Sequence, residues 1–196
     1  MKLVIFGAAG TIGSRIAAEA EARDHEVTRL RSADADVTDP AAVADAVAGH
    51  DAIVSAVGSF ADLGLLTRAA RALLQGAGDA GVTRLLVVGG AGSLEVAPGQ
   101  RLVDTPEFPE EWKPSALAHA DALEVYRADT SLDWTYVSPA ALIEPGERTG
   151  AYRIGGEQLL VDEGGDSRIS AEDYAIAIVD ELEHPTHVRR RITVAY

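Results

Sequence analysis

The chain has 196 residues, no cysteine and a formal net charge of −14. This length predicts one domain whose core needs no cross-link, and the absence of thiols excludes disulfides, cysteine-ligated metals and thiol catalysis. Basic residues are few and dispersed, and no apolar run is long enough to span a bilayer. We therefore expect a cytoplasmic monomer or weak homodimer with no nucleic-acid partner, no membrane partner and no metal site.

The first 30 residues predict a strand, a glycine turn, a helix and a second strand. The apolar run Leu3–Phe6 lacks polar alternation, which is typical of a strand buried on both faces. It breaks into Gly7-Ala8-Ala9-Gly10-Thr11-Ile12-Gly13, and the alanine-rich segment that follows favours a helix. A strand at Glu26–Leu30 comes next, so the opening is a βαβ unit, which requires a parallel sheet.

Strands and helices keep alternating through residue 88. Asp39 and Pro40 suit the N-cap and first position of a short helix. Apolar residues over 66–74 recur with helical spacing, which predicts an amphipathic helix that closes near Gly76 or Gly78. Buried strands are expected at Ala52–Val57 and Leu85–Val88.

Residues 89–114 differ from the rest of the chain because they are rich in glycine and proline. A long loop inside a compact domain is typical of a lid or binding loop, although a surface excursion tethered by Phe108 and Trp112 would have the same composition. Regular structure is expected to resume with a helix over 115–130, a strand over 134–137, short strands in a glycine-rich stretch, a helix over 171–182 and a strand over 191–194.

Together these elements predict one α/β domain over residues 1–196. We expect a three-layer, doubly wound Rossmann fold with a parallel sheet in the strand order 3-2-1-4-5-6. Ligands of such sheets bind at the carboxyl ends of the strands. Residues 89–114 and 140–168 are therefore predicted to form an acceptor pocket over that edge.

The spacing of Gly7, Gly10 and Gly13 indicates a dinucleotide site. A pyrophosphate must approach the backbone N–H groups at the start of a helix closely, and only glycine leaves room for it. The motif follows a buried strand and opens a helix, which is the context that supports this interpretation. The alternative is a tight turn without a ligand. The predicted cofactor contacts here are Gly7, Ala9, Gly10, Thr11, Ile12 and Gly13.

The end of the second strand bears on the choice of nicotinamide cofactor. An NAD site places an acidic residue there for the ribose hydroxyls, whereas an NADP site places an arginine for the 2′-phosphate. This chain has Arg31 and Ser32 at that point, and no acidic residue before Asp34. NADP(H) is therefore favoured over NAD(H). The alternative is that Arg29 and Arg31 are ordinary solvated side chains.

Six short motifs spread over the whole chain carry a resemblance to a known family. They are Gly7 to Gly13, Asp36-Val37-Thr38-Asp39, Ser55-Ala56-Val57-Gly58, Val88-Gly89-Gly90-Ala91-Gly92-Ser93, Asp133-Trp134-Thr135-Tyr136-Val137-Ser138-Pro139 and Ile169-Ser170-Ala171-Glu172-Asp173-Tyr174-Ala175. Through them the sequence resembles the atypical short-chain dehydrogenase/reductases of the NmrA-like kind, and among these the NADH-flavin reductase-like proteins related to biliverdin reductase B.

The resemblance implies further cofactor contacts. Asp36 and Val37 would meet the adenine, and the turn Ala56, Val57 and Gly58 would lie under the adenine ribose and the diphosphate. The later motifs add the remaining predicted contacts, which are Gly89, Gly90 and Pro139.

One departure from the larger superfamily narrows the chemistry. That superfamily uses a Tyr-x-x-x-Lys pair, in which lysine lowers the pKa of the phenol for proton exchange with a carbonyl or alcohol. The only lysines here are Lys2 and Lys113, and Pro109 stands four residues before the second. This argues against alcohol dehydrogenation and sugar epimerisation. We expect NAD(P)H-dependent reduction of a small flavin-like or quinone-like acceptor, with flavin as a candidate substrate. The alternative is a non-catalytic NADP(H)-binding redox sensor that acts through a protein partner.

The predicted catalytic candidates are His119 and Ser93. The resemblance implies a histidine beside the substrate on the helix that carries His119, and such a side chain could exchange a proton at neutral pH. A polar residue on the helix surface is the alternative. Ser93 lies just past a strand end, where it could bond the acceptor or cap the loop. Trp112 and Phe108 could stack on a planar acceptor or anchor the loop.

Overall fold

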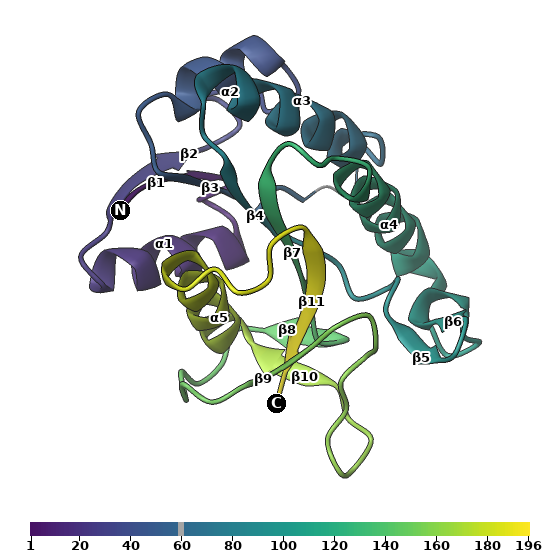
Figure 1. Ribbon diagram of the computed structural model, residues 1–196. Helices are drawn as coiled ribbons and strands as arrows, with labels where there is room; N and C mark the ends of the chain where they lie inside the picture. The colour runs from purple at the N-terminus through teal and green to yellow at the C-terminus, as the bar shows by residue number, and fades with distance from the viewer. Residues whose placement is uncertain (59–60) are drawn as a thin grey trace.

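The computed structural model describes residues 1–58 and 61–196, which form a central sheet with helices on both faces (Figure 1). Within these residues the sheet has seven strands in the order β2-β1-β3-β4-β7-β11-β9. The strands are β1 (Lys2–Phe6), β2 (Glu26–Leu30), β3 (Ala52–Ser55), β4 (Arg84–Val88), β7 (Asp133–Pro139), β9 (Arg153–Gly155) and β11 (Arg190–Ala195).

The helices divide between the two faces of the sheet (Figure 1). Apolar residues of α1 (Thr11–Ala22) and α5 (Ala171–Glu183) form one buried cluster with the strands. The other face is covered by α2 (Pro40–Val47), α3 (Leu65–Ala80) and α4 (Lys113–Arg127), whose apolar residues form a second cluster. All neighbouring strands are parallel except β9, which pairs antiparallel with β11. The predicted three-layer, doubly wound α/β class is confirmed.

The predicted strand order 3-2-1-4-5-6 is wrong at one end. The third strand, β3, does not lie outside β2 but pairs with β1 on one side and β4 on the other. Burial explains this placement: Ala52–Ser55 is buried at every position, which an edge strand cannot be. In contrast, β2 has no fully buried residue, as expected of the edge strand it is.

The helix boundaries follow local chemistry, with two corrections. The helix predicted over 115–130 is α4, which begins earlier, at Lys113, and ends earlier, at Arg127. Asp39 caps α2 as predicted, since its carboxylate accepts a hydrogen bond of 3.0 Å from the Ala41 N–H. However, α3 does not close near Gly76 or Gly78 but runs to Ala80 and ends at Gly81, which has φ +73°. Gly76 serves packing instead, because a Cβ there would stand 2.6 Å from the Pro40 carbonyl oxygen of α2.

The segments predicted to differ from the core form small elements beyond the main sheet. Residues 95–112 hold the hairpin β5 (Glu95–Ala97) and β6 (Gln100–Arg101) and two short 3₁₀ turns, η1 (Leu102–Asp104) and η2 (Glu110–Trp112). Later, β8 (Leu142–Glu144) pairs with β10 (Arg168–Ser170). In the described parts of the chain no helix is long and apolar enough to cross a membrane, and no cluster of acidic and histidine side chains could hold a metal ion.

Candidate functional site

The glycine turn after β1 stands at the carboxyl edge of the sheet and is held by close backbone contacts. Gly7 has φ +77°, and a Cβ there would lie 2.5 Å from the Ala56 carbonyl oxygen at the end of β3. A Cβ on Gly13 would run into the Gly7 carbonyl. These two glycines therefore let the turn after β1, the start of α1 and the turn after β3 pack against one another.

Gly10 has a different surrounding. It is the N-cap of α1, is exposed and provides no side-chain cap, so the first N–H groups of the helix face outward without one. A Cβ at Gly10 would meet only the Gly7 carbonyl oxygen, at an ordinary 3.4 Å. The fold alone thus does not require glycine here. Open space at a helix N-terminus with no acidic residue in its first turn fits a diphosphate.

The remaining predicted residues of this turn surround Gly10. Ala9 and Thr11 are exposed beside it, while Ile12 is half-buried against the core on the α1 side. The turn therefore presents backbone N–H groups and small side chains to a ligand. Ile12 anchors the turn to the core.

At the end of β2, Arg31 is paired rather than free. Its Nε donates to Asp34 Oδ2 at 3.0 Å, and its backbone N–H donates to the same oxygen at 2.8 Å. The guanidinium holds the pKa of the Asp34 carboxyl below its usual range. The Arg31 side chain is nevertheless 68% exposed, and Ser32 beside it is exposed as well. Arg29 bonds Glu21 of α1 through two nitrogens, at 2.9 and 2.7 Å.

The residues that the resemblance assigns to the adenine and ribose lie along the same edge. The Asp36 carboxylate accepts hydrogen bonds from the backbone and hydroxyl of Thr38, at 2.9 and 2.7 Å, and is exposed. Val37 is half-buried against the core beneath α2 and α3. After β3 the chain passes through Ala56 and Val57, both half-buried, to the exposed Gly58.

Gly89 and Gly90 follow β4, and the lack of a Cβ at each leaves room for a neighbouring side chain. A Cβ on Gly89 would overlap the ring of Tyr136, and one on Gly90 would stand 3.0 Å from the Cβ of His119. Both glycines therefore have a packing role, whether or not a ligand also approaches them. Pro139 is the last residue of β7, the neighbouring strand, and is buried.

His119 lies on α4 with its imidazole turned toward the sheet. The Tyr136 hydroxyl donates to the His119 backbone carbonyl at 3.0 Å and lies 3.4 Å from its Nδ1. Burial lowers the pKa of His119 to about 4, so the ring is neutral at pH 7. Together with Ser55, Val57 and Val88, His119 lines a small cavity at the carboxyl ends of β3 and β4.

Ser93 is bonded to Arg191, which the sequence reasoning did not single out for the site. Arg191 Nη1 donates to the Ser93 hydroxyl at 2.8 Å, and Nη2 lies 3.3 Å from the Ser93 carbonyl oxygen. The same guanidinium forms an ion pair with Glu157. The Glu157 carboxylate also accepts a hydrogen bond of 2.7 Å from Arg127 of α4. We name the three residues Ser93, Glu157 and Arg191 the loop clamp, because they join segments 89–114 and 140–168 to β11. No local pattern in the sequence links residues so far apart.

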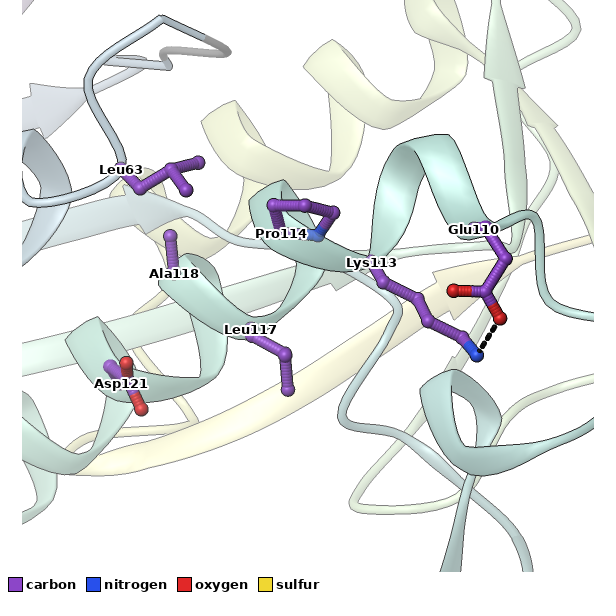
Figure 2. Close-up of a pocket in the computed structure, with 7 residues that line it drawn as sticks. All are labelled: Leu63, Glu110, Lys113, Pro114, Leu117, Ala118 and Asp121. Atoms are coloured by element: carbon purple, nitrogen blue, oxygen red, sulfur yellow. Dashed lines mark hydrogen bonds and ion pairs between the residues drawn. The ribbon is translucent and has the colours of Figure 1, made fainter.

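An apolar groove opens between the segment before α3 and the start of α4 (Figure 2). Its volume is about 420 Å³. The groove and the His119 cavity are both lined from α4, the groove by Ala118 and the cavity by His119. Of the two aromatic residues of interest, Trp112 is 50% exposed just before α4, and Phe108 is half-buried. The groove is lined by Leu63, Glu110, Lys113, Pro114, Leu117, Ala118 and Asp121.

A glycine turn between a central parallel strand and a helix, with open space at the helix N-terminus, defines a class of protein: the α/β dinucleotide-binding domains. Residues 7–185 match the family described as NAD(P)H-binding. The chain belongs to this NAD(P)H-binding family, and the resemblance drawn from the sequence motifs is confirmed.

Solved structures that are similar over 100% of this chain include the following three. A "putative exported protein" from Burkholderia pseudomallei is 50% identical, with 100% of that chain covered and a TM-score of 0.93. A "putative epimerase" from Bacteroides thetaiotaomicron is 40% identical, with 96% covered and a TM-score of 0.93. A "putative NADH-flavin reductase" from Streptococcus pneumoniae TIGR4 is 40% identical, with 99% covered and a TM-score of 0.89.

Proposed function

We propose that the protein is an NAD(P)H-dependent reductase of a small flavin-like or quinone-like acceptor. The observation that carries this proposal is the arrangement of the carboxyl edge. The open glycine turn at Gly10 suits a diphosphate, and an apolar groove of about 420 Å³ stands between the segment before α3 and the start of α4, the helix that also carries His119. Such an edge has room for a dinucleotide and a second, planar molecule.

The side chains favour hydride acceptors that need little help from the protein. When bound, a reduced nicotinamide supplies a hydride, and the acceptor needs one further proton. His119 is neutral at pH 7 because its pKa is about 4, so it can position a polar group by hydrogen bonding but holds no ready proton on a charged imidazolium. Flavins and quinones can take that proton from water. The task of the protein is then to orient the two rings and exclude water between them.

The names given to two similar structures indicate two different reactions, and the sequence favours one of them. The relative from Streptococcus pneumoniae is named for NADH-flavin reduction, and that from Bacteroides thetaiotaomicron for epimerisation. No tyrosine in this chain has a lysine four positions later. The lack of this pair supports reduction of a flavin or quinone over proton exchange at a sugar hydroxyl.

The proposal extends to the cofactor preference of the reductase, the role of Ser93 and the setting in which the protein acts. NADP(H) is preferred over NAD(H), because Arg31 and Ser32 are exposed at the end of β2. Ser93 serves the acceptor side indirectly, through the loop clamp, since its hydroxyl is bonded to Arg191. The protein acts in the cytoplasm as a monomer or weak homodimer, without a nucleic-acid or membrane partner, as its net charge of −14 favours.

The test is a steady-state assay of NADPH and NADH oxidation with added riboflavin, FMN or a quinone, read by absorbance at the nicotinamide band. We expect turnover with at least one acceptor and no turnover without it. Binding of NADPH with no oxidation in the presence of all three acceptors would contradict the proposal. That outcome would favour the alternative function, a redox sensor, because a sensor binds the cofactor without turning it over.

A further inference from the structure

We infer that the groove between α3 and α4 takes a planar aromatic acceptor whose side arm carries no phosphate or carboxylate. A riboflavin-type ring should therefore bind better than its phosphate ester, FMN. This inference rests on the proposed function, since it assigns the acceptor site of that reductase and the charge that the site tolerates.

The walls of the groove are apolar although they face solvent. Leu63 and Leu117 are 43% and 41% exposed, and Pro114 and Ala118 lie between them (Figure 2). The stripe Pro114, Leu117, Ala118 follows one face of α4, opposite Leu63 from the segment before α3. A concave apolar surface of this size is of the volume that small-molecule sites occupy, which is about 300 to 1,000 Å³. A flat ring would cover these side chains and remove their exposed surface from water.

The charges around the groove determine which charge the side arm of a bound ring can carry. Lys113 is the cation of the lining, and it is paired with Glu110 of η2 (Figure 2). Asp121 then adds a negative charge at the other end of the groove. Arg101 is hydrogen-bonded to Asp104 at 2.7 and 2.9 Å. This bond, and to a lesser extent the charge of Asp121, raises the pKa of the Arg101 guanidinium. Arg68, which reaches the backbone beside Leu63, is bonded to Asp62 at 2.5 Å. Each of these cations is thus paired with a carboxylate.

The surrounding segment strengthens this imbalance. Residues 100–121 contain five acidic residues and two basic ones, a net charge of −3. Those acidic residues are Asp104, Glu107, Glu110, Glu111 and Asp121. A phosphate monoester carries about −1.5 to −2 charges at pH 7, so it would enter a field of its own sign. An uncharged side arm meets no such repulsion.

The expected size of the effect follows from exposed charges in water. Two unit charges about 7 Å apart in water repel weakly, so a nearly doubly charged phosphate facing one uncompensated carboxylate should lose about fivefold in affinity. Salt should erase most of this loss, because the screening length falls to about 3 Å at 1 M ionic strength. The discrimination should therefore be clear at low ionic strength and small at high ionic strength.

Riboflavin and FMN make a matched pair of probes because they share one ring and differ by the phosphate. The protein, saturated with NADP⁺ so that no turnover occurs, is titrated with each flavin, and flavin fluorescence gives the dissociation constants. We expect riboflavin to bind about fivefold more tightly than FMN at low salt. Asp121→Asn should bring the two constants together by strengthening FMN, and Leu117→Ala should weaken both flavins alike.

A charge control comes from α3. Asp79 is exposed in the last turn of that helix, and Asp79→Asn changes the net charge as Asp121→Asn does, but it does not line the groove. This control should leave the ratio of the two constants unchanged. Equal or tighter binding of FMN, or a ratio that Asp79→Asn shifts as much as Asp121→Asn, would overturn the inference.

Failure of the inference and failure of the proposed function give different results. If FMN is bound and reduced at least as well as riboflavin, the reductase stands and the charge selection of the groove is wrong. If neither flavin binds but a quinone is reduced, the groove is not a flavin site and the inference again falls, while the function holds. If NADPH binds and no acceptor is reduced, the proposed function itself is contradicted.

Discussion

The two halves of the carboxyl edge of the sheet differ in the groups that form them, which are backbone on one side and side chains on the other. On the dinucleotide side, the contacts are made by backbone: Gly7 and Gly13 permit close approach of the chain to itself, and Gly10 leaves open space. On the acceptor side, side chains define the space, through His119, the apolar groove and the loop clamp. A site made of backbone limits which residues can stand in it, whereas a site made of side chains can change its ligand by substitution. We therefore expect substitutions on the first side to act on folding or on cofactor binding, and those on the second to tune turnover.

The largest effect should come from Gly13 on the dinucleotide side. Gly13→Val would force a side chain into the Gly7 carbonyl, and neither group can move without shifting β1 or α1. We expect a loss of more than about 4 kcal/mol in the free energy of unfolding, measured by urea denaturation. Gly78 is the control, because a Cβ there, in the last turn of α3, meets nothing within 4 Å. Gly78→Ala should keep or raise stability; an equal loss in both variants would contradict the packing role of Gly13.

Next in size is the effect of Arg31 on cofactor choice. Arg31→Ala should weaken NADPH by roughly 10 to 100 times, since a charge-assisted hydrogen bond contributes about 1.5 to 3 kcal/mol, and should leave NADH almost unchanged. Asp34→Asn should do the reverse and strengthen NADPH, because Asp34 now holds the guanidinium and would repel a phosphate. Dissociation constants for both cofactors at one fixed ionic strength provide the test. A wild-type preference for NADH would show that the end of β2 does not bind a 2′-phosphate.

On the acceptor side, burial of His119 should make stability depend on pH. Its pKa is lowered from 6.5 to about 4 in the folded protein, so the unfolded chain binds the extra proton first. The stability from keeping this ring neutral is complete above pH 6.5 and is lost as pH falls toward 4. Between pH 7 and pH 5 this amounts to about 2 kcal/mol. Urea denaturation of the wild type and His119→Gln at both pH values isolates it; parallel losses would show that His119 is not buried in solution.

The smallest effect concerns turnover. His119→Ala should lower kcat by less than about a hundredfold, because general acid catalysis contributes roughly 10² to 10⁴ and a flavin or quinone can draw its proton from water. NADPH affinity should remain as in the wild type. Steady-state kinetics with riboflavin or a quinone measure both quantities. Complete loss of turnover with intact cofactor binding would indicate a carbonyl-like acceptor, for which a protein proton donor is essential.

The same division between backbone and side chains explains what the sequence could predict. The buried strand Leu3–Phe6, the glycine turn and the αβ alternation are local patterns, and each appears in the structure where the pattern placed it. The strand order could not be predicted from local patterns. The position of β3 beside β1 depends on burial of Ala52–Ser55 on both faces, which is determined by the assembled sheet. The apolar residues Ala52, Ile53 and Val54, with no polar alternation, were the available signal.

The acceptor side was harder to predict because its partners are far apart in the sequence. Ser93 and Arg191 are separated by 98 positions, and their hydrogen bond forms only because β11 brings the guanidinium under the loop after β4. Likewise, Leu63 faces the start of α4 across the groove without any shared motif. Periodicity and motif spacing describe neighbours within a helix or strand, so they cannot reveal pairs that tertiary packing creates.

Gly10→Val tests most directly whether the turn from Gly7 to Gly13 binds the dinucleotide. A Cβ at Gly10 meets only the Gly7 carbonyl oxygen, at 3.4 Å, so the variant should still fold, losing about 1 kcal/mol at the N-cap, while its side chain occupies the space for the diphosphate. NADPH binding, followed by titration of nucleotide fluorescence, should become undetectable or fall more than about a hundredfold. A folded Gly10→Val variant that binds NADPH with wild-type affinity would contradict the account.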